Sequence, residues 1–219
     1  MISRIGLKLL DACHSRLVLL VGLVLCLGAS LCPAQAPTAG GKDNLIKLPR
    51  TRQSTDHTCG VAALQSVLGY SVEDIREDKL AKQIGTTEEG TKYMAIADFA
   101  RSEGLQVEVR HNMTLADLQH ALDQRRPVIV AIQAWREAPG DWTKDWDDGH
   151  YVVVIGYDPE NIYLMDPSVL GNYAYIPVQE FLDRWHDTDL DQTIKLIHLG
   201  IIAWKDKPVY NPDAMIRTE

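Results

Sequence analysis

Cysteine is scarce in this chain once its N-terminal segment is set aside. Four cysteines occur among the 219 residues, and only Cys59 lies beyond residue 36. A lone cysteine cannot form a disulfide within its own domain, so the fold is not one of those that cross-links hold together. The residues beyond position 36 are numerous enough to bury about 70% of their surface on folding. We therefore expect one domain whose hydrophobic core is stable without disulfide cross-links.

Basic residues are also in the minority. The chain has 22 Lys and Arg against 30 Asp and Glu, a net charge of −8, which becomes −10 without residues 1–36. Such an acidic domain offers no basic patch for nucleic acid and is unsuited to anionic lipid. A glycine-rich phosphate loop is missing from the sequence as well, so we expect no role for ATP and no cofactor.

One long hydrophobic run occurs near the N-terminus. Leu17–Leu27 is an almost unbroken Leu/Val stretch that follows three basic residues and precedes small residues ending at Ala36. This pattern predicts a signal peptide over residues 1–36 and an exported protein, periplasmic or extracellular. An uncleaved inner-membrane anchor is the alternative, because the uncharged stretch to Ala36 is about long enough to span a bilayer.

The remaining sequence divides into a linker over 37–45, a domain over 46–204 and a polar C-terminal tail over 205–219. Helices are predicted at 59–68, 71–83, 91–103, 114–124 and 178–185. Glycines are expected to end the first three, at Gly69, Gly85 and Gly104. Capping-box spacings are expected to open the second at Ser71 and the fourth at Thr114. Strands are predicted at 105–110, 128–132, 151–157, 162–165, 173–176 and 194–204. Helices mostly precede strands, which is typical of an α+β fold in which a helical lobe packs on an antiparallel sheet and a cleft lies between them.

Cys59 lies where a polar loop turns into a helix rich in small apolar residues. Unpaired N–H groups and the positive end of the helix dipole favour a thiolate at such a position. These are the conditions that a cysteine nucleophile needs. The position alone leaves a second interpretation open, a small buried core thiol.

Three polar residues are candidate partners of this thiol. His150 lies at the mouth of a predicted buried strand, Asp166 ends the next strand, and Gln53 lies in the loop before Cys59. A simple hairpin register pairs Asp166 with Val153, which leaves about 10 Å between the carboxylate and His150 along a regular strand. Each residue also has an ordinary interpretation: a solvated loop histidine, a turn carboxylate before proline, and a polar loop residue.

Together these residues carry a resemblance to a known family. The segments concerned are Gln53–Leu64, Thr91–Val107, Arg126–Ile129 and Gly149–Pro167. They resemble the bacteriocin-processing, or double-glycine, cysteine peptidases, in the form of a stand-alone exported member. The resemblance implies a two-lobed papain-like fold in which the central helix bears the catalytic cysteine. Thr58 departs from the family, which often has an acidic residue directly before the cysteine.

The same resemblance implies a role for each candidate residue. Cys59 is implied as the nucleophile, His150 as general base and acid, Asp166 as its orienting partner and Gln53 as an oxyanion donor. The implied activity is hydrolysis of peptide bonds in a peptide or protein substrate.

Three other functions stay open at this point. The same triad could serve an acyltransferase or amidase, and a papain-like domain could be a non-catalytic binding module. A metal site of His150, Asp148 and Cys59 is a third idea, although it lacks the short ligand spacings of structural zinc sites.

The loop from Trp135 to Trp146 is expected to form one lip of the cleft. Its tryptophans predict either an aromatic substrate groove or a satellite core under the loop; they are Trp135, Trp142 and Trp146. Its carboxylates hint at a positively charged peptide substrate; they are Asp141, Asp145, Asp147 and Asp148.

Overall fold

The computed structural model describes residues 44–136, 140–215 and 217. The predicted signal segment lies outside the described residues, as does nearly all of the predicted linker. The helices in the described part are α1 (Cys59–Ser71), α2 (Glu77–Ile84), α3 (Tyr93–Ser102), α4 (Leu115–Asp123), α5 (Val178–Arg184) and the 3-10 turn η2 (Trp142–Lys144). None of these helices is long and apolar enough to cross a membrane.

The strands form one large antiparallel sheet and one small one. They are β1 (Gln106–Arg110), β2 (Val128–Gln133), β3 (Gly149–Tyr157), β4 (Asn161–Met165), β5 (Ala174–Pro177), β6 (His186–Thr188), β7 (Lys195–Ile197) and β8 (Gly200–Trp204). The large sheet has the order β1-β8-β2-β3-β4-β5, and β6 pairs with β7. The predicted α+β architecture is therefore confirmed.

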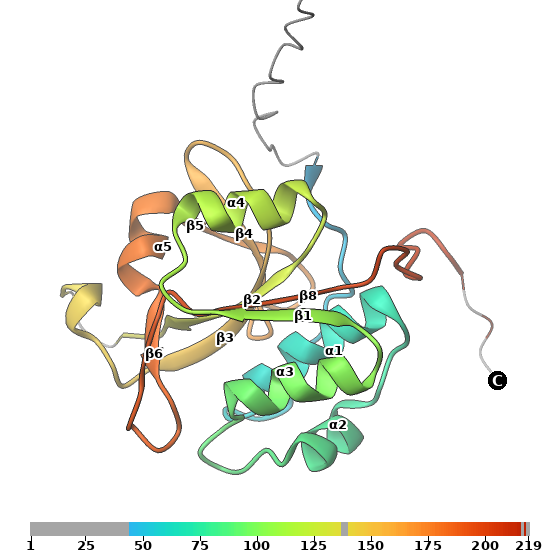
Figure 1. The fold of residues 1–219 in the computed structure, drawn as a ribbon, viewed down its shortest axis with the longest axis horizontal. Helices are drawn as coiled ribbons and strands as arrows, with labels where there is room; N and C mark the ends of the chain where they lie inside the picture. The colour runs from blue at the N-terminus through green and yellow to red at the C-terminus, as the bar shows by residue number, and fades with distance from the viewer. Residues whose placement is uncertain (1–43, 137–139, 216, 218–219) are drawn as a thin grey trace, which may run out of the picture. The chain divides into compact units, whose positions relative to one another are not determined.

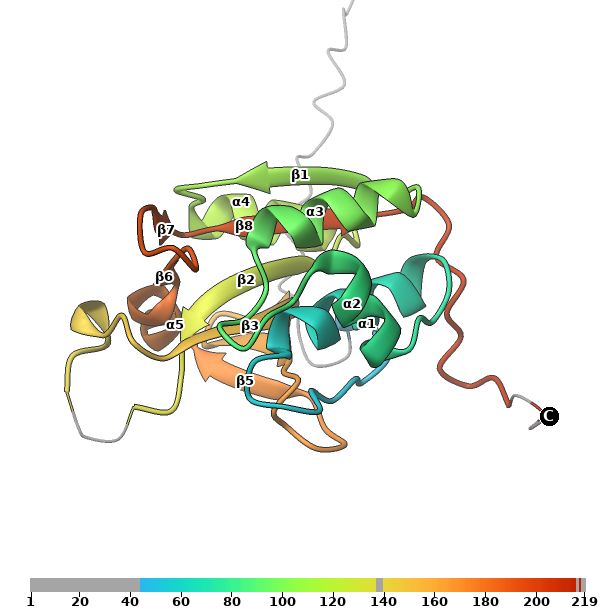
Figure 2. The ribbon, with the colours of Figure 1, turned by 90° about the horizontal axis from the view of Figure 1, so that it is seen from below.

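Helices cover both faces of the large sheet. In Figures 1 and 2, α1, α2 and α3 lie together on one side of the strands, and α4 lies on the other. All six residues of β2 are buried. A strand covered on both faces is expected to be apolar throughout rather than alternating, and this explains the continuous run Val128–Ile132.

Small residues let α1 approach the sheet closely. A Cβ added at Gly60 would lie 3.1 Å from side-chain atoms of Ile96, Thr91 and Tyr151. These neighbours belong to the helical side and to β3, so Gly60 is the point where the two layers meet. Because Cys59 is the adjacent residue, this contact holds the thiol against the start of β3.

Two predicted helix boundaries are wrong. The first helix does not end at Leu68 but continues through Gly69 to Ser71. Glycine is used there for close packing rather than as a stop, since a Cβ would lie 3.2 Å from Pro49 Cγ. The second helix begins at Glu77 instead of Ser71, because Ser71 is buried as the last residue of α1.

The last predicted strand is also divided. Residues 194–204 form β7 and β8, separated at His198, which adopts φ 44°. A left-handed residue breaks the extended backbone. The break lets β7 pair with β6, whereas β8 joins β1 and β2 in the large sheet.

Candidate active site

Cys59 is the first residue of α1, as predicted, and it is largely buried with 9% of its surface exposed. Thr58 precedes the helix, but its side chain makes no capping hydrogen bond. Its hydroxyl instead accepts a hydrogen bond from the backbone N–H of Thr55, at 3.2 Å. The first N–H groups of a helix have no partner within the helix, so this end of α1 stays available to a negative charge.

His150 lies inside β3 rather than in the loop before it, and it is 1% exposed. Its Nε2 lies 2.8 Å from Asp166 Oδ1. The other ring nitrogen, Nδ1, is buried and has no hydrogen-bond partner of conventional geometry among the described residues. The ring also interacts with the Cys59 thiol. The structure thus places one imidazole between a thiol and a carboxylate.

Charge around the ring shifts its pKa. Burial by itself would lower the pKa of His150, but the hydrogen bond to Asp166 and the interaction with Cys59 outweigh it and raise the pKa to about 9. An opposite charge close to a titrating group stabilises its charged form. The site therefore favours an imidazolium at neutral pH.

A β-bulge brings Asp166 to the histidine. Met165, not Asp166, lies opposite Val153, because the register between β3 and β4 shifts by one between Val154 and Gly156. The predicted pairing of Asp166 with Val153 is therefore wrong by one residue. The bulge inserts an extra residue into β3 and moves the end of β4 toward His150.

The N-terminal part of the domain holds this bulge. The backbone N–H of Ile46 donates to the carbonyl of Ile155, the extra residue, at 2.8 Å. A Cβ added at the next residue, Gly156, would overlap the side chain of Leu45. The segment that precedes α1 therefore packs on the irregularity that sets the position of Asp166.

Asp166 is fixed by more than the histidine. Its Oδ1 also accepts hydrogen bonds from the backbone N–H and the hydroxyl of Ser168, at 2.8 and 2.7 Å. Burial would raise the pKa of Asp166, but the bonds from His150 and Ser168 outweigh it, and the pKa is lowered. The carboxylate is therefore charged and can orient the imidazole.

Gln53 lies in the loop before α1, and its backbone N–H donates to the carbonyl of Pro167 at 3.1 Å. This bond ties the Gln53 loop to the end of β4, next to Asp166. The side-chain Nε2 donates to the carbonyl of Thr55 at 2.8 Å, and Oε1 is buried without a partner among the described residues. The role of oxyanion donor stays a prediction.

The three tryptophans of the cleft loop have different surroundings. Trp135 is 54% exposed and its ring lies 4.4 Å from the ring of His150. The guanidinium groups of Arg136 and Arg184 both lie over the Trp142 ring, at 4.1 and 4.5 Å from its centre. Trp146 packs against His186 at 4.4 Å. Trp135 therefore covers the histidine on the solvent side, and only Trp146 of the three lines the adjacent cavity.

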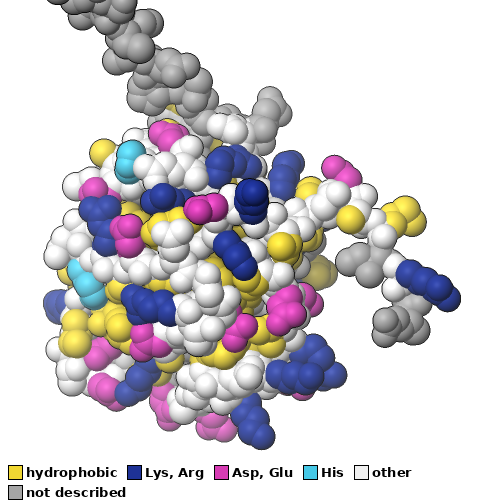
Figure 3. All heavy atoms as spheres, turned by 45° about the vertical axis from the view of Figure 1, so that its right-hand side comes forward, with side chains coloured by type: hydrophobic (Ala, Val, Ile, Leu, Met, Phe, Trp, Pro, Cys, Tyr) yellow, Lys and Arg dark blue, Asp and Glu magenta, His cyan; other side chains and the backbone are white. Residues whose placement is uncertain are grey.

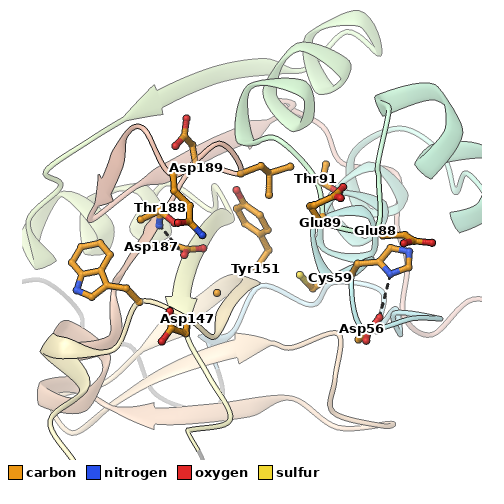
Figure 4. Close-up of a pocket in the computed structure, with 16 residues that line it drawn as sticks. Asp56, Cys59, Glu88, Glu89, Thr91, Asp147, Tyr151, Asp187, Thr188 and Asp189 are labelled. Carbon is orange, nitrogen blue, oxygen red and sulfur yellow. Dashed lines mark hydrogen bonds and ion pairs between the residues drawn. The ribbon is translucent and has the colours of Figure 1, made fainter.

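A cavity of about 460 Å³ opens beside the thiol. In Figure 4, Cys59 lies between acidic residues of the helical side and acidic residues of the sheet side. The acidic residues that line the cavity are Asp56, Glu88, Glu89, Asp147, Asp187 and Asp189. On the face drawn in Figure 3, by contrast, Lys and Arg side chains lie among Asp and Glu side chains.

Of the four loop carboxylates singled out in the sequence, only Asp147 lines this cavity. In the described part of the chain, no group of three or more His, Cys, Asp or Glu side chains is arranged to hold a metal ion. The alternative metal site of His150, Asp148 and Cys59 therefore does not form there.

Sequence reasoning missed several residues around the site. Gln133, at the end of β2, is fully buried and donates to the carbonyl of His186 and to Asp187 Oδ1. Its Oε1 accepts from the backbone N–H of Asp148 at 3.0 Å. The sequence feature that could have identified Gln133 is its position as a polar residue at the end of an apolar strand. Asp187 itself had no local signal, because only the fold brings it beside Gly149.

Comparison with known proteins points to one family. The profile of the Peptidase_C39 like family matches residues 45–190. A protein of Methanothermobacter marburgensis is 34% identical over 119 residues, which cover 54% of this chain and 70% of that protein.

Solved structures with a similar fold agree. A putative C39-like peptidase from Bacillus anthracis has a TM-score of 0.58 at 19% identity, covering 73% of this chain and 96% of that one. The peptidase domain of Streptococcus ComA, a bifunctional ABC transporter, has a TM-score of 0.53 at 20% identity, covering 73% and 98%. At these identities the likeness establishes the fold, and the predicted papain-like peptidase fold is confirmed.

Proposed function

The chain belongs to the Peptidase_C39 like family of cysteine peptidases, and we propose that it hydrolyses peptide bonds with Cys59, His150 and Asp166 as its catalytic triad. The observation that carries this proposal is the position of His150. Its Nε2 hydrogen-bonds to the carboxylate of Asp166, and the ring interacts with the only thiol in the described residues. A nucleophile, a base and an orienting group in this order are the components of a catalytic triad.

We propose one step for each residue. His150 Nδ1 accepts the proton of the Cys59 thiol, and the sulfur attacks the carbonyl carbon of the scissile bond. The oxyanion forms near the unpaired N–H groups at the start of α1, with the Gln53 amide as the proposed second donor. His150 then gives its proton to the leaving nitrogen, the C–N bond breaks, and a thioester remains. Water, deprotonated by His150, releases the acid and restores the thiol.

Asp166 and Trp135 support these steps without touching the substrate's carbonyl. The carboxylate stabilises the imidazolium that forms when the thiol loses its proton. The Trp135 ring, tilted by 54° against the imidazole with the ring centres 4.4 Å apart, limits the access of water to the His150–Asp166 pair. Both effects maintain the charge separation on which the attack depends.

Peptide cleavage and thiol reactivity test this function together. Wild type, Cys59→Ala and His150→Gln are compared on a peptide library, with His120→Gln as a matched control on an exposed face of α4. We expect cleavage to be lost in the first two variants and kept in the control. Incorporation of ¹⁸O from labelled water into the new carboxyl end distinguishes hydrolysis from acyl transfer.

The rate at which Cys59 is alkylated is a second test of the triad. Reaction with iodoacetamide at pH 6 is followed by mass spectrometry on the tryptic peptide 53–76, which separates Cys59 from the three N-terminal cysteines. A thiolate–imidazolium pair reacts at this pH, and we expect the rate to fall at least about tenfold in His150→Gln. Equal alkylation rates in wild type and His150→Gln, together with no peptide cleavage by wild type, would refute the proposed triad.

We also propose that the protein acts outside the cytoplasm. The support is the sequence pattern alone: a basic flank, the Leu17–Leu27 run and small residues up to Ala36. Cell fractionation followed by measurement of the intact mass tests it. A protein found in the cytoplasm at its full length would contradict export, whereas a full-length membrane-bound protein would favour the anchor.

A further inference from the structure

We propose that the cavity beside Cys59 is a subsite for a basic side chain of the peptide substrate, with Asp187 as its anchoring carboxylate. This inference rests on the proposed peptidase function and adds to it the chemical class of substrate. Three independent features of the cavity support it: its charge, an unpartnered hydroxyl, and the surroundings of Asp187.

The charge of the cavity has one sign. Six Asp and Glu residues line it, and the described lining contains neither Lys nor Arg. His57 also lines it, with Nδ1 3.2 Å from Asp56 Oδ1. Two lysines interact with residues in or next to the lining in sequence: Lys92 pairs with Asp191 at 3.1 Å, and Lys195 lies over the ring of Trp146. A cleft lined by charges of one sign concentrates the opposite charge.

The second feature is the Tyr151 hydroxyl. Tyr151 follows His150 on β3, is only 8% exposed, and lines the cavity into which Figure 4 shows it pointing. Its hydroxyl has no hydrogen-bond partner among the described residues. Burial raises the pKa of Tyr151 well above its ordinary value, so the group keeps its proton. The hydroxyl thus faces the cavity without a partner from the described protein, and a polar group of a ligand there can hydrogen-bond to it.

The third feature is Asp187 on β6. Its Oδ1 accepts from the backbone N–H of Thr188 at 2.8 Å and from Gln133 Nε2 at 3.3 Å. Its Oδ2 accepts no hydrogen bond from the described residues. Burial raises the pKa of Asp187 to about 6, in spite of these bonds and of the nearby His150. At neutral pH the carboxylate is charged and incompletely compensated, which a bound cation would correct.

Glycine at position 149 makes room for this carboxylate. A Cβ at Gly149 would overlap the carboxylate atoms of Asp187. Because Gly149 directly precedes His150, the carboxylate lies against the backbone next to the catalytic base. In this position the carboxylate can form an ion pair with a basic side chain beside the scissile bond.

The dimensions and the spread of charge favour a side chain over a metal ion. The volume of about 460 Å³ lies within the range of ordinary ligand pockets. The carboxylates are distributed over opposite walls and do not converge on one point in the described structure. A Lys or Arg side chain, with several donors on a long stem, matches carboxylates that are spread in this way. Since Cys59 is part of the wall, that side chain belongs to a residue next to the cleaved bond.

Thiol-modifying reagents of opposite charge test the subsite without requiring peptidase activity. The full chain is treated with a trimethylammonium-ethyl or a sulfonato-ethyl methanethiosulfonate, and modification of Cys59 is read on the tryptic peptide 53–76. Each rate is divided by that reagent's rate on the unfolded protein. We expect the cationic reagent to be favoured by at least about tenfold. Asp187→Asn should reduce this ratio several-fold, whereas Asp206→Asn, at an exposed carboxylate outside the lining, should leave it unchanged.

A ratio near one in wild type, or a ratio that Asp187→Asn leaves intact, overturns the subsite. Asp147→Asn is a second lining variant, for which we expect a smaller decrease; it keeps the test decisive if Asp187→Asn folds poorly. A ratio that falls equally in Asp206→Asn would assign the effect to the net charge of the protein and would also overturn the subsite.

Cleavage of matched peptides then separates this inference from the proposed function. Library members that differ only by arginine or the isosteric neutral citrulline beside the scissile bond are compared. We expect arginine to be preferred by about tenfold or more, and the preference to shrink in Asp187→Asn and Tyr151→Phe. Equal cleavage of both peptides overturns the subsite and leaves the peptidase intact. No cleavage of either, with the reagent ratio preserved, overturns the peptidase function and leaves the cationic site.

Discussion

Asp187 is expected to destabilise the folded protein at neutral pH. A carboxyl group whose pKa is about 6 in the folded protein, against an ordinary value of 3.8, is ionised less readily after folding. Between these two pH values the folded state binds a proton that the unfolded state has lost, so stability falls as pH rises. Above pH 6 both states are ionised and the loss is complete.

The magnitude follows from the two pKa values. One pKa unit corresponds to about 1.4 kcal/mol, so the ionised Asp187 lowers the free energy of unfolding by about 2–3 kcal/mol at neutral pH. Asp187→Asn removes the charge and keeps an oxygen that can accept from Thr188 and Gln133. The variant should therefore gain about 2–3 kcal/mol relative to wild type between pH 4 and pH 7.5.

Urea unfolding of wild type and Asp187→Asn at the two pH values measures this difference. Comparing the change with pH, rather than the stability at one pH, cancels any fixed effect of the substitution. Asp191→Asn is the control, since its exposed partner Lys92 makes little contribution. If Asp187→Asn differs from wild type by the same amount at pH 4 and pH 7.5, the reasoning about Asp187 is wrong. A carboxylate retained at such a loss in stability is what a functional group would show.

Three further substitutions test the site and the fold. Asp166→Ala should lower kcat/KM by roughly 10³–10⁴, because it removes the carboxylate that orients His150 and stabilises its imidazolium. A decrease below tenfold would contradict that role. Trp185→Ala should lower the free energy of unfolding by about 3–5 kcal/mol, because it removes a fully buried indole and its hydrogen bond to the carbonyl of Leu199 at 2.9 Å. A loss under about 1 kcal/mol would contradict this role in the core. Thr114→Ala should lower the free energy of unfolding by about 1 kcal/mol without changing the urea m-value, because the substitution removes the capping box with Asp117. An unchanged midpoint of urea unfolding would contradict this.

Local patterns in the sequence were sufficient for several of the regular elements. The capping box at Thr114 and the left-handed glycines after α2 and α3 are features of a few neighbouring residues, and the structure confirms α4, α3 and the end of α2 near the predicted positions. The same holds for β2, whose unbroken apolar run required burial on both faces.

The start of α2 shows the limit of such patterns. The segment after α1 has the spacing of a capping box, yet Ser71 is buried at the end of α1, so the pattern is not used. Gly69 likewise does not end the helix; it lies inside α1, where a Cβ would come within 3.2 Å of Pro49 Cγ. Both outcomes depend on which residues from other parts of the chain lie nearby, and a local pattern does not contain that information.

The sequence by itself determined the kinds of residue in the site and their order along the chain: a thiol at a helix start, an imidazole at a strand, and a carboxylate after the next strand. Only the tertiary structure decided whether they meet. The bulge at Ile155, held by Ile46, moves Asp166 by one position and allows the 2.8 Å contact with His150. The acidic cavity likewise exists only after folding, because β6 and the loop after α2 are brought together from distant parts of the chain.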